Sequence, residues 1–411
     1  MDSPCDSVIG DRDLLTEILL RLPVKQVIQC KCVCKKWSSL ISNTKFPYSH
    51  TCRLYHKYNN NPPPTALLVQ NFADTKAQRA SIVPLHANDN NDNKMFFHLD
   101  LDGCNYRSSI MHSCNGLLLW NVIPTSQPGP TSEDSRACHF RIHNPAMSDD
   151  HCVYLDYPVG DVDSPYGDDI FEPFELKAYL VFEPLKQPLS YKVILFGQMD
   201  PSVIYYRRRV EFKVLNPRIE IRLYSSETCG WSEVICNLPD GLRVTEGVYC
   251  NAAIHWFRLD HDNSLYFDTN RLCFDKLLAV PSVDDSCVKY FGECRGRLHL
   301  ILSDTLEFDI WELEEDYSSW VARYRVNLNR MHDGESALWW NVSSNPFSVL
   351  SFVHRQEEEE ENSMLVLFKD GKIMSYSLED YGLRVLCKVY RDEVPRSIHQ
   401  YFETLLCVGN S

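Results

Sequence analysis

The chain has 411 residues, 44% of them hydrophobic, which is enough for more than one domain or for one large repeat fold. Its 41 basic and 56 acidic residues give a net charge of -15. Because a general binder of phosphate backbones needs a surplus of Lys and Arg, this charge argues against a nucleic-acid partner.

The start of the chain does not have the pattern of an export signal. Residues 1–13 carry four Asp and one Arg, and no run of about 18 apolar residues occurs anywhere. We therefore expect a soluble intracellular protein, cytoplasmic or nuclear, without a membrane partner. The 17 cysteines are then expected to be reduced and mostly buried thiols.

Residues 13–42 form the only long segment with a helical pattern. Apolar residues of its first helix recur at every fourth position: Leu14, Ile18 and Leu22. Pro23 should end that helix, and further helices are expected from about Lys25 and around Trp37. Three short helices bury little apolar surface, so we expect part of it to be kept for a partner.

A change of composition predicts the domain boundary. The Asn- and Pro-rich stretch 58–64 cannot be helical and indicates a linker or an exposed loop. The predicted organisation is a helical domain at 1–52 with its core at about 9–50, a linker at 53–64, and a β domain at 65–411.

Short runs rich in β-branched and aromatic residues follow the linker and alternate with turn residues, which predicts strands. These runs are 66–69, 179–182, 191–196, 219–224, 299–302 and 364–368.

A turn followed by alternating apolar residues recurs along this β region, at 114–120, 250–256, 294–300 and 369–373. Ala252 and Gly296 are 44 residues apart, and the 136 residues from Gly116 to Ala252 are close to three such steps. The 75 residues from Gly296 to Gly371 fit this period poorly. A period of about 40 to 50 residues with four strands is typical of β-propeller blades.

The predicted fold is therefore α+β, with a small three-helix domain before a predominantly β, propeller-like domain of irregular blades. A second repeat places Trp231 and Trp320 89 residues apart, about two steps. The tryptophans are expected in blade cores rather than in a ligand cage: Trp231, Trp256, Trp311, Trp320, Trp339 and Trp340. A closing strand is predicted at the C-terminal apolar residues: Tyr401, Phe402, Leu405, Leu406 and Val408.

The helical segment closely resembles the F-box of plant F-box proteins. The resemblance lies in the order and spacing of Asp13 to Lys25, of Cys32-Val33-Cys34-Lys35-Lys36-Trp37 and of Leu40-Ile41. The rest is similar to the F-box-associated propeller domain of the same proteins, at 113–117, 219–231, 246–256, 316–320 and 401–405. Ile9-Gly10 stands where that family often has Leu-Pro, and we expect this difference to weaken the first adaptor contact.

The resemblance implies the substrate-recognition subunit of a Skp-cullin-F-box ubiquitin-protein ligase. Such a subunit bridges a Skp-type adaptor, and through it a cullin and a RING protein, to a target protein that the sequence does not identify. Catalysis is by proximity, so neither a catalytic residue, nor a cofactor, nor a metal is expected. Six positions are implied to form or support the adaptor-facing surface: Leu14, Ile18, Leu22, Pro23, Val33 and Trp37. The alternative is that these residues are only the core of the helices.

Several motifs have a competing interpretation. Cys30, Cys32 and Cys34 are spaced too closely for a typical zinc site. Residues 292–296 have the outline of a nucleophile elbow, but the strand expected after them favours a simple turn. Arg207 to Arg209 fit an exposed strand better than an import signal. The acidic run 357–361 predicts a solvated loop, with a docking site for a basic partner as the alternative.

Two other classes of function stay open. A propeller enzyme would need convergent carboxylates or metal ligands. A protein-interaction scaffold would use the F-box outside ubiquitin transfer.

Overall fold

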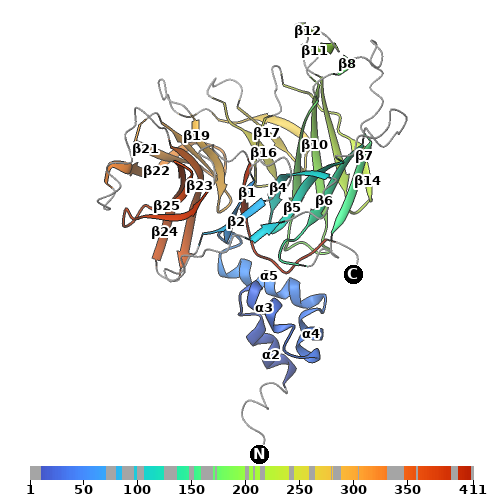
Figure 1. The fold of residues 1–411 in the computed structure, drawn as a ribbon, viewed down its shortest axis with the longest axis vertical. Coiled ribbons are helices and arrows are strands. Elements are labelled where there is room, and N and C mark those ends of the chain that lie inside the picture. Colours follow the sequence, from blue (N-terminus) through green and yellow to red (C-terminus); the bar gives the residue numbers. More distant parts are fainter. Residues whose placement is uncertain are drawn as a thin grey trace, which may run out of the picture.

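The computed structural model of the protein describes most of the chain and shows helices at one end of a β-propeller (Figure 1). The described residues are 11–70, 80–85, 97–99, 106–124, 137–147, 152–158, 170–171, 174–199, 203–206, 209–212, 218–239, 245–258, 264–278, 280, 288–303, 305–330, 347–357, 360–389 and 397–408. Ile9-Gly10, Arg207, Arg208, Trp339, Trp340 and two residues of the acidic run 357–361 lie outside them.

The helical domain, here residues 11–57, contains four helices rather than the three that were predicted. They are α2 (Arg12–Leu19), α3 (Val24–Cys30), α4 (Lys35–Ile41) and α5 (Lys45–Lys57). The carboxylate of Asp11 caps α2 by accepting hydrogen bonds from the backbone N–H groups of Asp13 and Leu14. The fourth helix continues to Lys57, inside the range that was predicted as a linker.

Six four-stranded antiparallel sheets, which we call blades 1 to 6, make up the propeller. Blade 1 contains β27 (Ser397–Tyr401), β1 (Ala66–Gln70), β2 (Ala80–Pro84) and β3 (Phe97–Leu99). Blade 2 contains β4 (Tyr106–Cys114), β5 (Leu117–Pro124), β6 (Ala137–His143) and β7 (Val153–Pro158). Blade 3 contains β9 (Phe174–Phe182), β10 (Tyr191–Met199), β13 (Arg218–Ser225) and β14 (Gly230–Glu233).

The remaining blades follow the chain order without interruption. Blade 4 contains β15 (Val248–Cys250), β16 (Ala253–Trp256), β17 (Leu265–Asp268) and β18 (Cys273–Lys276). Blade 5 contains β19 (Val288–Cys294), β20 (Arg297–Leu302), β21 (Glu307–Leu313) and β22 (Trp320–Asn327). Blade 6 contains β23 (Ser348–Glu357), β24 (Glu360–Lys369), β25 (Lys372–Ser377) and β26 (Leu383–Lys388).

Neighbouring blades contact one another through their first strands. This holds for β27 with β4, β4 with β9, β15 with β19, and β19 with β23. First strands that meet in this way surround a common axis, as in a propeller. The predicted strand runs all lie in strands of these blades, so the propeller-like prediction is confirmed.

The recurrent turns are tight hairpins with positive φ at both central residues. The φ values are 49° and 89° at Asn115 and Gly116, and 52° and 72° at Arg295 and Gly296. Positive φ at both positions is the requirement of a type I′ turn, whose twist matches that of the flanking strands. Residues 292–296 therefore belong to a strand–turn–strand hairpin, as the turn interpretation expected.

One predicted repeat spacing was wrong, and the spacing that fitted the period poorly joins turns that are not equivalent. The turn at Gly371 joins the second and third strands of its blade, whereas the other three join first and second strands, so its distance from Gly296 is not a blade period. The 136 residues from Gly116 to Ala252 span two blade steps rather than three. Part of the excess is an insertion in blade 3: β11 (Val203–Tyr206) and β12 (Arg209–Phe212) lie between its second and third strands.

Ala252 occupies a turn position where the equivalent residues are glycines. Its φ is 56°, which costs an L-residue with a Cβ atom about 1 kcal/mol. Ala252→Gly should remove this cost, but glycine also has more conformational freedom in the unfolded chain, which offsets part of the gain. We therefore expect the free energy of unfolding to rise by about 0.5 kcal/mol. Urea unfolding should measure this. Ala253→Gly, in the adjacent strand, should destabilise instead, and the prediction fails if both variants lose stability equally.

Of the six tryptophans that were assigned to blade cores, two are core residues, as predicted, and two pack against the cores. Trp256 and Trp320 are buried, and Trp231 and Trp311 are half-buried against the clusters between blades. They therefore stabilise contacts between blades.

The C-terminal residues close the ring, but not as predicted. All five residues of β27 pair with β1, so the first blade combines both ends of the β domain. Of the five apolar residues assigned to the closing strand, only Tyr401 belongs to it. Residues 402–408, which we call the base segment, leave the sheet and run between the propeller and the helices (Figure 1).

A small extra sheet lies at the end of the propeller opposite the helices (Figure 1). It contains β8 (Ile170–Phe171), β11 and β12. Arg209, from the basic triplet, is the first residue of β12.

Candidate functional site

Three of the six predicted adaptor-facing residues are large apolar side chains that lie exposed on the surface. The exposed fractions are 43% for Leu14, 39% for Ile18 and 61% for Val33. Leu14 and Ile18 are one turn apart on α2, while their neighbours Leu15 and Leu19 are buried in the helical core. The apolar residues of α2 therefore form two faces, and only one of them is needed for folding.

This exposure is concentrated in a short part of the chain. Of the nine large apolar residues exposed in the described parts of the structure, three fall between positions 14 and 33. Single exposed apolar residues are ordinary, and the pair that shares one face of α2 makes this helix the candidate contact surface.

The other three predicted residues have a different environment. Leu22 and Trp37 are half-buried against the core of the helices, and Pro23 is exposed at the start of α3. The carbonyl oxygen of Leu22 lies 2.8 Å from Nε2 of His50 on α5. Leu22 and Trp37 are thus placed to support the outward residues.

The cysteines beside Val33 are free thiols. Cys30 is half-buried, and Cys32 and Cys34 are exposed. Within the described ranges, no group of three or more His, Cys, Asp or Glu side chains is placed to hold a metal ion.

Helix α5 connects the helical domain to the propeller and lies between the other helices and the blades (Figure 1). The hydroxyl of Tyr48 donates to the carbonyl oxygen of Leu185 at 3.2 Å. The hydroxyl of Tyr55 donates to Oδ1 of Asn115 at 2.8 Å, and Nδ2 of Asn115 donates to the carbonyl oxygen of Phe182 at 2.7 Å. These bonds tie α5 to the turns of blades 2 and 3.

The base segment is held from both sides. Its Leu405 is buried in the core of the helices, and Leu406 and Val408 are buried in the core of blades 2 and 3. Nδ2 of Asn144, which follows β6, donates to the carbonyl oxygens of Thr404 and Leu406 at 2.7 and 2.8 Å. A Cβ atom at Gly116 would lie only 2.3 Å from Cγ2 of Thr404, so close packing here requires glycine. The two domains are therefore joined by a packed interface.

Buried histidines make the fold sensitive to acid. Burial lowers the pKa of His255 to about 4, burial and the nearby His399 lower that of His112 to about 3, and burial lowers that of His50. A folded-state pKa below the usual value of about 6.5 means that the unfolded chain binds protons first, so stability falls as pH drops below that value. Burial raises the pKa of Glu293 to about 7, and this group acts in the opposite direction.

We expect the free energy of unfolding to fall by roughly 2 kcal/mol between pH 7 and pH 5, since each of His112 and His255 contributes about that much and Glu293 offsets part of it. Urea unfolding across this range should show it. In Glu293→Gln the offset is removed, so the fall should be steeper. A stability that does not change between pH 7 and 5 in either chain would contradict this account.

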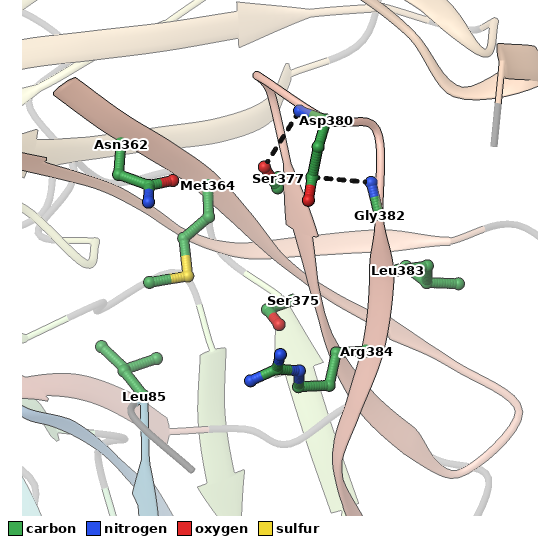
Figure 2. Close-up of a pocket in the computed structure, with 9 residues that line it drawn as sticks. All are labelled: Leu85, Asn362, Met364, Ser375, Ser377, Asp380, Gly382, Leu383 and Arg384. Atoms are coloured by element: carbon green, nitrogen blue, oxygen red, sulfur yellow. Dashed lines mark hydrogen bonds between the residues drawn. The ribbon is translucent and has the colours of Figure 1, made fainter. Parts of the chain in front are cut away.

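A pocket of about 330 Å³ lies between blade 6 and the end of β2 in blade 1 (Figure 2). Asp380 and Arg384 lie at opposite ends of it, with Met364 and Leu85 along one wall. Oδ1 of Asp380 accepts a hydrogen bond from the backbone N–H of Gly382 at 3.0 Å. A hydrogen bond with Ser377, then the bond from Gly382 and the charge of Arg384, lower the pKa of Asp380. The lining offers a charge of each sign, which suits binding of a polar group.

No helix in the described part of the chain is long and apolar enough to cross a lipid bilayer.

Comparison with known proteins agrees with this architecture. The family profile described as F-box domain matches residues 11–48. The chain is 22% identical to F-box protein At5g07610 of Arabidopsis thaliana, over 91% of this chain and 84% of that protein. It is 24% identical to the F-box/kelch-repeat protein At3g23880 of the same plant, over 80% and 81% of the two chains. The chain thus carries an N-terminal F-box domain joined to a six-bladed propeller.

Similarity to solved structures is weaker. A post-proline cleaving enzyme from Rickettsia typhi aligns with 95% of this chain and 59% of its own, at 10% identity and a TM-score of 0.35. This agreement is too low to bear on function.

Proposed function

We propose that this chain is the substrate-recognition subunit of a Skp-cullin-F-box ubiquitin ligase, and that it acts without a catalytic residue of its own. Leu14, Ile18 and Val33 would contact the Skp-type adaptor, and the propeller would hold the target protein. The observation that carries the proposal is the exposed apolar face of α2 within the segment that matches the F-box profile.

The packed interface between the domains supports this role. A ligase receptor must hold its target at a defined place relative to the conjugating enzyme, because proximity is what it contributes to the reaction. Hydrogen bonds from Tyr48 and Tyr55 and the burial of Leu405 give the helical domain one orientation on the propeller. The far end of the propeller, with its extra sheet, would then face away from the adaptor and be open to a target (Figure 1).

A direct test is assembly with purified partners. The full-length chain should form a stable complex with a Skp-type adaptor, and that complex should recruit a cullin. Adaptor binding without cullin recruitment would favour the scaffold alternative. Failure to bind any Skp-type adaptor would overturn the proposal.

A further inference from the structure

The helical domain carries a charge opposite to that of the rest of the molecule. Residues 18–73 contain eight Lys and Arg residues and no Asp or Glu. The rest of the chain therefore holds the other 33 basic residues and all 56 acidic ones. The overall charge of -15 is therefore unevenly distributed, with a basic helical domain and an acidic propeller.

Most of these cations are on the surface. All are exposed except the half-buried Lys31: Arg21, Lys25, Lys35, Lys36, Lys45, Arg53 and Lys57. Arg21 and Arg53 both lie 3.4 Å from the carboxylate of Glu17, which offsets part of their charge. Lys25 interacts with the carboxylate of Glu403 in the base segment. The nearest lysines on either side of Val33 are Lys31 and Lys35.

From this arrangement we infer that the helical domain docks on an acidic surface of the adaptor, and that the exposed Lys35 and Lys36 steer the two proteins together. The inference rests on the proposed function and names the chemistry of the partner at that same surface. Charges at the edge of an interface act mainly on the association rate, which they can raise tenfold or more, and much less on the lifetime of the complex.

A protein surface fits these residues better than a phosphate backbone or a lipid headgroup. The exposed Leu14, Ile18 and Val33 lie in the same domain as the lysines, and an apolar centre with a charged rim is the usual composition of a protein interface. Nucleic acid and anionic membranes present charge over long distances, so they would also meet the excess of carboxylates on the propeller. At physiological salt, charges interact over about 8 Å. A partner that contacts only the helical domain is therefore not repelled by the carboxylates of the propeller.

The test measures association kinetics of the full-length chain with a purified Skp-type adaptor between 50 and 500 mM NaCl. In Lys35→Glu/Lys36→Glu the association rate should fall about tenfold at low salt, with little change in dissociation. Both substitutions lie in the first turn of α4, where a carboxylate is compatible with the helix dipole, so the fold should be kept. The matched control is Lys276→Glu/Lys388→Glu, two exposed strand lysines of blades 4 and 6, which changes the net charge equally.

The outcomes separate this inference from the proposed function. Slow association only in the α4 variant, together with a native rate that falls as salt rises, supports the inference. If the complex forms but its association rate changes neither with salt nor with the α4 substitutions, the inference is overturned and the proposed function still stands. Absence of any complex overturns both. Binding of the native chain to duplex DNA or to phosphatidylserine vesicles, lost in the α4 variant, would show that the lysines serve another anion and would also overturn it.

Discussion

Leu14→Asp/Ile18→Asp should weaken adaptor binding at least about a hundredfold while leaving the protein folded. Both side chains are exposed, at 43% and 39%, so the substitutions should change the free energy of unfolding by no more than about 0.5 kcal/mol. In the complex they would bury two carboxylates in place of two apolar contacts. We expect a loss of at least about 3 kcal/mol of binding, which is roughly a hundredfold in Kd.

The matched control for this variant lies on the propeller. Ile235 and Leu238, exposed at 90% and 43%, offer the same pair of residue types outside the helical domain. Ile235→Asp/Leu238→Asp should bind the adaptor as the native chain does, and calorimetric titration would compare all three. Equal affinity of the α2 variant and the control would show that α2 does not face the adaptor.

Removal of residues 397–411 should unfold the whole protein. The truncation removes β27, which is the first strand of blade 1, and leaves β1 paired with β2 alone. It also removes four buried apolar side chains: Tyr401, Leu405, Leu406 and Val408. At about 1.5–3 kcal/mol each, their loss is comparable with the entire stability of a typical domain.

Two shorter truncations separate ring closure from domain attachment. A chain ending at Tyr401 keeps β27 but lacks the base segment, so the propeller should stay closed while the helical domain loses the contact of Leu405. A chain ending at Val408 should unfold like the native protein. Thermal unfolding distinguishes these cases. A native-like transition of the chain that lacks residues 397–411 would mean that blade 1 does not depend on β27.

The sequence predicted the two domain types because their signals are local. Helical periodicity at Leu14, Ile18 and Leu22 requires only neighbouring residues, and so does a turn such as Asn115-Gly116 between apolar runs. It did not predict α5, because Pro47 and the polar residues after it weaken the helical pattern. Proline is tolerated in the first turn of a helix, where its missing N–H has no intrahelical partner.

Long-range features were harder to predict for a physical reason. The pairing of β27 with β1 joins residues more than 300 positions apart, and the role of Leu405 depends on a helix at the other end of the chain. A run of apolar residues shows that they are buried but not which partner buries them. The division of α2 into a core face with Leu15 and Leu19 and an outer face with Leu14 and Ile18 likewise emerges only once the helices are packed.

The most direct test of the central claim is ubiquitin transfer in a reconstituted reaction. A target protein captured with the native chain is supplied with adaptor, cullin, RING protein and a charged conjugating enzyme, and the native receptor is compared with Leu14→Asp/Ile18→Asp. Point variants are preferable to deletion of residues 1–52, because Tyr48 and Thr51 of α5 contact the propeller and the base segment. We predict modification of the target only with the native receptor, and equal modification with both receptors would contradict the claim that this face bridges the target to the ligase.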